Sequence, residues 1–97
     1  MPAKMKAMSN QEFLKCLRAV LVGSLAKAGI KVDEFSSEPI RGTKLNRILI
    51  VADAFDNMGP SERQDLIWRI VDKHFSSDDQ LRISMIMALG SKETAGV

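Results

Sequence analysis

The sequence has little of what metal centres and catalytic sites are usually built from. Its 97 residues include one cysteine, one histidine and no tyrosine. A single cysteine, Cys16, cannot form an internal disulfide or a cysteine-cluster metal site, and His74 cannot build an imidazole site alone. We expect Cys16 to be a small hydrophobic residue on a helix flank, and His74 to be a packed or helix-terminal residue. The sequence thus predicts no metal site and no cofactor.

Motifs for catalysis are missing as well. There is no phosphate-binding loop and no Gly-x-Ser-x-Gly. Two carboxylate pairs occur, Asp53 with Asp56 and Asp78 with Asp79, but general acid–base chemistry would also need a concave apolar pocket, which nothing in the sequence predicts. We expect Asp56 to accept hydrogen bonds from turn amides, and the second pair to lie in a solvated loop. The chain is therefore predicted not to be an enzyme.

Long apolar segments are also absent. No run approaches the roughly 20 residues that a membrane span needs. Lys4 and Lys6 are not followed by the apolar stretch of a signal peptide before Gln11. These features predict a cytoplasmic protein with no membrane partner. A hydrophobic content of 45% is typical of a folded globular chain, and the length suits one domain.

The most regular pattern runs through residues 47–75. Residues 48–51 are four consecutive β-branched or leucine residues, which is typical of a strand buried on both faces. Gly59 and Pro60 must end this segment, and an amphipathic helix follows from Pro60 or Ser61, where Ser61 begins a capping-box spacing. We expect the following set to form the apolar stripe of this helix: Leu66, Ile67, Ile70, Val71, His74 and Phe75, with Trp68 at its edge and the indole nitrogen of Trp68 in solvent.

A first helix is predicted ahead of this segment. Ser9 and Glu12 have the spacing of a capping box, and Gly29 supplies the left-handed residue that ends a helix. We expect residues 1–8 to be a mobile tail, because they carry no cap and no partner pattern. The predicted apolar face of the helix consists of Phe13, Leu14, Leu17, Val20, Leu21, Leu25 and Ala28.

Two further strands are predicted beside the central one. Residues 30–38 alternate weakly and stop before Pro39, which cannot donate to a ladder, so we expect an edge strand in a hairpin with the central strand. Residues 81–89 alternate with period two, and a connection through a full helix favours a parallel, right-handed crossover. The predicted apolar set of this third strand is Leu81, Ile83, Met85, Met87 and Leu89.

These elements together predict an α+β fold with the order α-β-β-α-β. Two helices are expected to pack on one face of a three-stranded mixed sheet. No internal repeat or linker divides the chain. We therefore expect residues 9–94 to form a single domain and residues 95–97 to fray.

The junction between the central strand and the second helix resembles the BolA-like proteins. In that family an acidic residue and then a phenylalanine follow a strand, and an Arg-His pair comes eight and nine residues after the phenylalanine. Here Asp53 and Phe55 are followed by Arg63 at the arginine position. Ala88 and Glu93 resemble the family's ending, an alanine near the close of the last strand and a glutamate just after it.

The positions that differ from the family bear on cofactors. The resemblance covers about residues 10–94 and implies the BolA-like fold, which is itself similar to type II KH domains. Asn57 stands at the family's glycine position and Gln64 at the position of the histidine, and no histidine occurs near residues 80–82. BolA-like proteins are associated with monothiol glutaredoxins and a shared iron–sulfur cluster, held partly by those histidines. Because an iron site needs thiolate or imidazole donors, the resemblance implies the fold without the usual ligands.

The leading functional hypothesis is a non-enzymatic regulatory or adaptor protein with nucleic acid as its first candidate ligand. The resemblance implies this role, since some BolA-like proteins are described as DNA-binding transcriptional regulators. Arg41, Lys44 and Arg47 cluster in the hairpin and Arg63 lies near the start of the second helix, so we expect these four to contact phosphate. The Gly-x-x-Gly clamp of KH domains is absent from residues 42–45.

Two alternatives stay open. The first is a partner of a monothiol glutaredoxin in iron–sulfur trafficking, with an interface around Arg63, Gln64 and Arg82 and no ligands of its own. The second is a scaffold that dimerises through the edge strand of residues 30–38. We accordingly expect a monomer or a weak homodimer.

Overall fold

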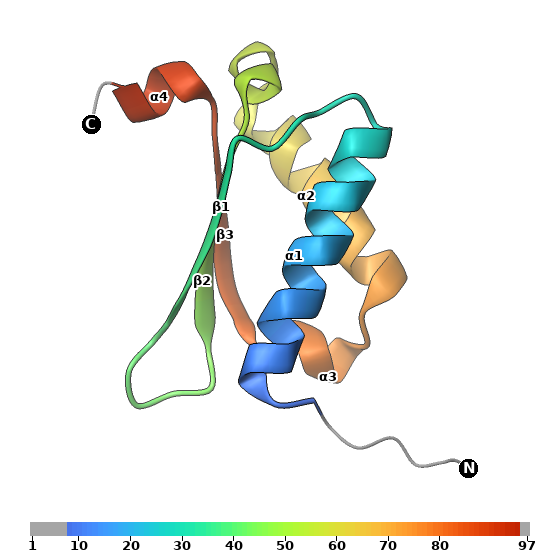
Figure 1. Ribbon diagram of the computed structural model, residues 1–97, viewed down its shortest axis with the longest axis vertical. Helices are drawn as coiled ribbons and strands as arrows, with labels where there is room; N and C mark the ends of the chain where they lie inside the picture. Colours follow the sequence, from blue (N-terminus) through green and yellow to red (C-terminus); the bar gives the residue numbers. More distant parts are fainter. Residues whose placement is uncertain (1–7, 96–97) are drawn as a thin grey trace.

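The computed structural model describes residues 8–95, except for the side chains of residues 94 and 95 (Figure 1). The predictions for residues 1–7 and 96–97 lie outside the described residues. In chain order the elements are α1 (Asn10–Lys27), β1 (Glu34–Pro39), β2 (Asn46–Val51), the 3-10 helix η1 (Asp53–Asn57), α2 (Pro60–His74), α3 (Ser77–Gln80), β3 (Ile83–Leu89) and α4 (Ser91–Ala95).

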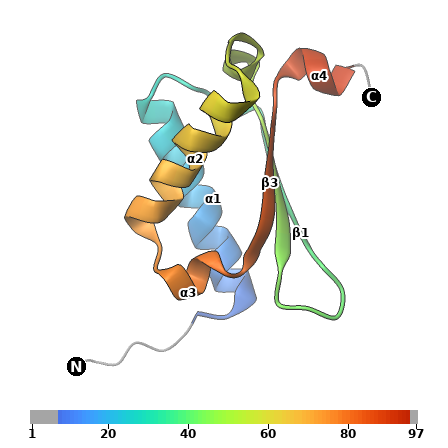
Figure 2. The ribbon, with the colours of Figure 1, turned by 180° about the vertical axis from the view of Figure 1, so that it is seen from behind.

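The three strands form one sheet in the order β1-β2-β3. β1 pairs antiparallel with β2, and β2 pairs parallel with β3. The helices α1 and α2 lie on the same face of this sheet, and the described residues leave the opposite face largely uncovered (Figures 1 and 2). The predicted α+β architecture, with a hairpin and a helical crossover, is confirmed.

One hydrophobic core fills the space between the helices and the sheet. Its largest side chains come from α1, α2, β2 and η1, and complete burial of each stabilises the fold by about 1.5–3 kcal/mol. The rings of Phe13 and Phe75 meet edge to face, with centroids 5.6 Å apart. The largest fully buried apolar side chains are Phe13, Leu17, Leu21, Leu25, Ile48, Ile50, Phe55, Ile67 and Val71.

The ends of α1 are those that the sequence predicts. The Ser9 hydroxyl accepts a hydrogen bond from the Glu12 amide at 3.1 Å, and the Glu12 carboxylate accepts one from the Ser9 amide at 2.9 Å. Hydrogen bonding of the Glu12 carboxylate to the Ser9 backbone, and after it to the Ser9 side chain, lowers the pKa of Glu12 below 4.5. At the other end, Gly29 has a φ of 85°, which glycine adopts without steric cost.

α2 begins at Pro60, as predicted, but its cap differs from the prediction. Gly59, not Ser61, is the residue before the first helical turn, and Pro60 occupies that turn. The Glu62 carboxylate accepts a hydrogen bond from the Gly59 amide at 3.1 Å. A cap therefore forms two residues earlier, since Pro60 has the φ of a helix and needs no amide partner.

Three predicted boundaries are also wrong. β1 begins at Glu34 and includes Pro39. Pro39 pairs with Asn46 at the end of the hairpin ladder, where the absence of a proline amide hydrogen costs least. Ile30 is buried but lies in a loop. Residues 77–80 form the short helix α3 instead of a loop, because the Ser76 hydroxyl caps it by accepting from the Asp79 amide.

The apolar set predicted for β3 faces the wrong way over most of the strand. The pairing shifts by one residue between Asn46 and Arg47, so that Ile83 lies opposite Asn46 while Met85 lies opposite Arg47. A one-residue shift exchanges the two faces of a strand. Ile86 and Ala88 are consequently buried, and Met85 and Met87 lie on the uncovered face, each 44% exposed.

None of the helices within residues 8–95 combines the length and apolar character that crossing a membrane requires.

The orientation of β3 can be tested with a matched pair of substitutions. Ile86→Asp would place an unpaired carboxylate against the core, and we expect it to lower the free energy of unfolding by about 3 kcal/mol or more. Met87→Asp would place the same group on the uncovered face and should change stability by less than about 1 kcal/mol. Urea denaturation of both variants measures the difference. Equal destabilisation would contradict the assigned faces.

Candidate functional site

The guanidinium of Arg63 lies inside the molecule. The residue is 6% exposed. Its Nε donates to the Met58 carbonyl at 3.0 Å, and its Nη1 donates to the Ala88 carbonyl at 2.9 Å and to the Glu93 carboxylate at 2.7 Å. A buried cation with a carboxylate and two carbonyl partners is a satisfied structural group. The prediction that Arg63 lies on the surface is wrong.

The residues that carry the family resemblance meet around this guanidinium. The carbon centre of the Arg63 guanidinium lies 5.9 Å from the centroid of the fully buried Phe55 ring. Ala88 and Glu93 supply two of its three acceptors. The spacing of Phe55, Arg63, Ala88 and Glu93 in the sequence thus reports a packing arrangement that connects η1, α2, β3 and α4. We call these four residues the Arg63 clamp.

Glu93 completes the clamp from the first turns of α4. Its carboxylate accepts from the Gly90 amide at 2.6 Å in addition to Arg63. The Gly90 hydrogen bond, and after it the Arg63 guanidinium, lower the pKa of Glu93 below 4.5. The carboxylate therefore stays ionised at neutral pH and balances the buried positive charge.

The carboxylates of Asp53 and Asp56 hold the same corner together. Asp53 accepts from the Ser91 hydroxyl, and Asp56 accepts from the Lys92 amide at 3.3 Å. The expectation that Asp56 satisfies turn amides is therefore wrong, since its partner is the start of α4. A Cβ atom on Gly90 would lie 2.8 Å from the Asp56 backbone nitrogen, so this position requires glycine.

The predicted partner-interface residues Gln64 and Arg82 make internal bonds. Gln64 donates to the Ile86 carbonyl at 2.8 Å and accepts from the Trp68 indole at 3.0 Å. The prediction that the indole nitrogen of Trp68 lies in solvent is therefore wrong. Arg82 donates to the Met8 carbonyl at 2.7 Å and lies 5.3 Å from the Phe13 ring centroid. The structure places Arg63 and Gln64 near one end of β3, and Arg82 before the other.

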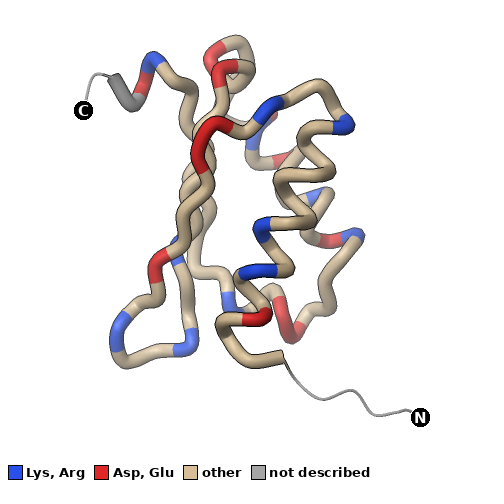
Figure 3. The backbone as a smooth tube through the Cα atoms, viewed as in Figure 1, with Lys and Arg blue, Asp and Glu red and all other residues tan. Residues whose placement is uncertain are grey.

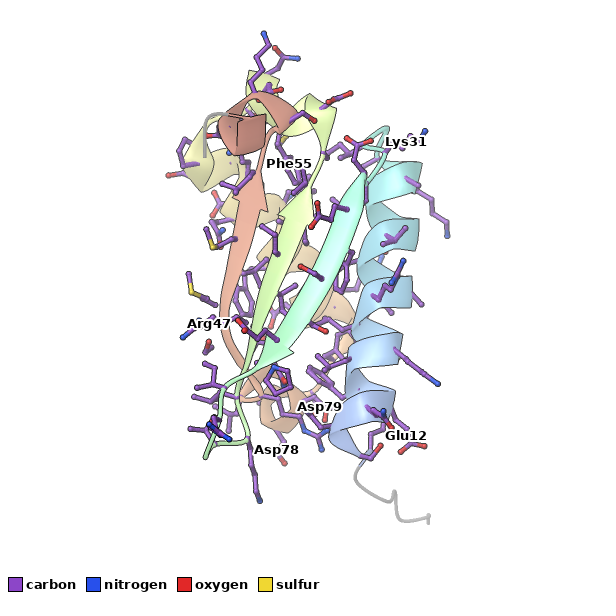
Figure 4. All side chains as sticks on the ribbon, turned by 60° about the vertical axis from the view of Figure 1, so that its left-hand side comes forward. Glu12, Lys31, Arg47, Phe55, Asp78 and Asp79 are labelled. Atoms are coloured by element: carbon purple, nitrogen blue, oxygen red, sulfur yellow. The ribbon has the colours of Figure 1, made fainter. Side chains whose placement is uncertain are left out.

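The hairpin cations, by contrast, are exposed. Arg41 and Lys44 lie in residues 40–45, which join β1 to β2, and neither forms an ion pair with any described residue. In the backbone trace of Figure 3, Lys and Arg positions are coloured blue on both sides of this hairpin, which projects from the end of the sheet. Arg47 lies on the uncovered face (Figure 4), where it forms an exposed ion pair of 3.6 Å with Glu38.

The backbone of the hairpin is held in one conformation. The Thr43 hydroxyl donates to the Ile40 carbonyl at 2.8 Å and accepts from the Leu45 amide at 3.0 Å. Gly42 has a φ of 79°, in the left-handed region. These features fix the positions of Arg41 and Lys44 at the tip.

A cleft of about 340 Å³ lies beside the hairpin, where the start of α1 meets the segment before β3. Below it, Asn46 is fully buried, and its side-chain amide exchanges two hydrogen bonds of 3.0 and 2.9 Å with Asn10. This pair was not predicted from the sequence, where its one signal is a polar residue at the start of an apolar strand. The cleft is lined by Met8, Asn10, Thr43, Lys44 and Arg82.

The remaining candidate residues make no site of their own. Cys16 is half-buried on α1 with a free thiol, as expected for a helix flank. His74 is an exposed residue in the last turn of α2, which confirms its helix-terminal interpretation. Within residues 8–95, no cluster of three or more His, Cys, Asp or Glu side chains is placed to hold a metal ion.

Removal of the guanidinium tests the structural role of Arg63. Arg63→Ala would leave two carbonyls and a carboxylate without their donor, and we expect it to lower the free energy of unfolding by about 3 kcal/mol. Arg63→Lys should recover only part of that loss, because an ammonium cannot reproduce the planar donor geometry. Urea denaturation provides the measurement. A change below about 0.5 kcal/mol for Arg63→Ala would contradict the clamp.

The pKa of Glu93 predicts how stability depends on pH. Because its pKa is lower in the folded state, the ionised carboxylate stabilises the fold above the usual value of 4.5, and this contribution is lost as pH falls below it. Glu93→Gln should therefore be less stable than the parent chain at pH 7, with the difference narrowing towards pH 3. Urea midpoints across this range would show it. A stability difference between Glu93→Gln and the parent chain that stays constant from pH 7 to pH 3 would contradict this role of the carboxylate.

Comparison with known proteins shows similarity at the level of fold. A solved structure described as a bol-like protein from Babesia bovis covers 96% of this chain and 96% of its own, with 15% sequence identity and a TM-score of 0.54. No protein-family model matches the sequence. No curated protein matches it either. The chain therefore has a BolA-like fold.

Proposed function

We propose that this chain is a non-enzymatic binding module that contacts the phosphate groups of nucleic acid through the hairpin of residues 40–45. The observation that carries the proposal is an exposed turn, held by its own hydrogen bonds, with two cations that have no ion-pair partner among the described residues. Such cations bind phosphate with little loss of favourable internal contacts.

The fixed backbone of the hairpin supports this role. A mobile loop would lose conformational entropy when its cations bind, whereas the Thr43 bonds already hold the tip. Arg41 and Lys44 flank Gly42 and Thr43, so one turn presents both charges. Contact with two neighbouring phosphates accounts for affinity without base recognition, since phosphate contacts position a protein and carry no direct sequence information.

One further cation, Arg47, can extend the surface, whereas Arg82 cannot. Arg82 lines the same cleft as Lys44, but two of its nitrogens donate to the backbone at Met8 and Ser9 and the third lies 4.0 Å from the Asp79 carboxylate. Arg47 shares its charge with Glu38, and both side chains are more than half exposed, so a phosphate can replace the carboxylate at low cost. Arg63 is not part of this surface because the clamp holds it.

A protein that binds a ligand without catalysing a reaction acts as a regulator or an adaptor, which is the role we propose here. The alternative, a partner of a monothiol glutaredoxin, would use the region of Gln64 and Arg82. Both side chains support β3 and the start of α1, so substitution there would disturb the fold as well as an interface. We therefore retain the glutaredoxin as a second candidate partner and include it in the same experiment.

The salt dependence of binding tests the hairpin directly. Arg41→Ala/Lys44→Ala should weaken binding to labelled duplex and single-stranded DNA, and should reduce the slope of log affinity against log salt by about 1 to 2. Fluorescence anisotropy at several salt concentrations measures both quantities. A cluster-loaded monothiol glutaredoxin, titrated in parallel, reports the second candidate through its absorption spectrum.

Arg69→Ala/Lys73→Ala is the matched control, because it removes the same charge from exposed positions on α2. It should retain most of the affinity. An equal loss in both double variants would mean that binding follows net charge, which would contradict a site at the hairpin. A spectral change with no DNA binding would favour the glutaredoxin partner instead.

A further inference from the structure

The two edges of the sheet differ in whether side chains bond to their outward-facing backbone groups. At β3, side chains from α2 bond to the strand's outward carbonyls: Gln64 donates to Ile86 at 2.8 Å, and Arg63 donates to Ala88 at 2.9 Å. These bonds cover the edge that would otherwise accept another strand. Among the strands of the described residues, β1 at the opposite edge pairs with β2 alone.

The pairing of β1 shows which backbone groups face outward. Ile40 donates to the Leu45 carbonyl at 2.9 Å, and the register continues with Glu38 opposite Arg47 and Ser36 opposite Leu49. In an antiparallel pair, alternate residues bond to the neighbouring strand and those between turn their backbone groups away. Phe35 and Ser37 therefore direct their amides and carbonyls away from β2. Within residues 8–95, no side chain bonds to these groups.

A groove of about 340 Å³ lies at this open edge, lined by residues of α1 and β1. These two elements run side by side in Figure 4. Leu14 and Phe35 are half-buried and give the groove an apolar floor. Lys15 and Arg18 stand exposed on the helix side, and neither forms an ion pair with a described residue. The complete lining is Gln11, Leu14, Lys15, Arg18, Phe35 and Ser37, which includes no carboxylate.

We infer that this groove binds an extended, acidic segment of a partner protein, which adds a fourth strand to the sheet beside β1. The partner's backbone bonds to Phe35 and Ser37, an apolar side chain lies against Leu14 and Phe35, and carboxylates pair with Lys15 and Arg18. Backbone bonds supply affinity in this mode of recognition, and the side-chain pockets supply specificity. The surface is separate from the hairpin, so this inference does not depend on the proposed nucleic-acid role.

The charge of the groove favours an acidic partner over a second copy of this chain. Pairing of β1 with β1 of a second copy would bring the two α1 helices together, with Lys15 and Arg18 of each copy in adjoining grooves. Like charges in that arrangement oppose association. Pro39 also lies at an outward-facing position and has no amide to donate, which limits the open edge to Phe35 and Ser37.

The probe for the test is a fluorescein-labelled peptide of sequence Thr-Glu-Thr-Val-Thr-Glu-Thr, added to the full 97-residue chain. In an added strand its Glu, Val and Glu side chains share one face. We expect Lys15→Glu/Arg18→Glu to weaken binding by about tenfold or more. Arg69→Glu/Lys73→Glu makes the same charge change on α2 and should bind as the parent does. Absence of binding to the parent, or an equal loss in both variants, would overturn the proposal.

Amide hydrogen exchange identifies the strand contact itself. The amides of Phe35 and Ser37 should gain protection when the peptide binds, while those of Ser36 and Glu38, which already bond to β2, should not change. Protection confined to residues outside β1 would overturn strand addition. Protection of Phe35 and Ser37 in the free protein that rises with protein concentration would mean that a second copy occupies the edge, and would overturn the acidic partner.

Discussion

The fold depends on the burial of one charged group, the guanidinium of Arg63. Transfer of an unpaired cation into a protein interior costs several kcal/mol, so the fold is stable only if the acceptors arrive together. They come from three places along the chain: the Met58 carbonyl before α2, the Ala88 carbonyl on β3 and the Glu93 carboxylate on α4. The same group thereby fixes the start of α2, the last strand and the terminal helix relative to one another.

This use of charge separates the structural cations from those that can bind a ligand. Arg63 donates to the Ala88 carbonyl on β3, and Arg82, which lies just before β3, donates to the Met8 carbonyl before α1. Arg41 and Lys44 lie on a turn that its own hydrogen bonds hold, so they are free to meet an external anion. Arg63 and Gln64 also bond to the edge of β3, which leaves β1 as the edge able to accept another strand. The internal bonds thus leave the hairpin and the β1 edge as the two surfaces that we propose for partners.

Much of the fold follows from the sequence, because local rules and burial agree there. The Ser9 capping box, the α1 stripe and Gly29 specify the first helix, and the apolar central strand specifies β2. The burial of Arg63 could also have been predicted from the sequence, since Arg63, Ile67 and Val71 recur every four residues on one buried face of α2. Helix α3 had a comparable signal in the spacing of its Ser76 cap and Asp79.

Other features depend on contacts that no local pattern contains. Residues 85–89 are all apolar, so alternation cannot tell which face is buried, and the shift opposite Asn46 decides it. The exposure of Arg41 and Lys44 was predictable from a glycine-containing turn. The cleft between Lys44 and Arg82 was not, because it forms only when the hairpin, α1 and the segment before β3 come together.

The central claim is that exposed hairpin cations bind phosphate while Arg63 stays in the clamp. An amide chemical-shift titration of the labelled chain with a short DNA duplex at low salt tests it most directly. We expect chemical-shift changes centred on the amides of residues 40–45 that disappear as salt is added, while the amides around Arg63 and Glu93 stay unchanged. Shifts centred on the start of α2 and on Glu93, with the hairpin unchanged, would contradict it.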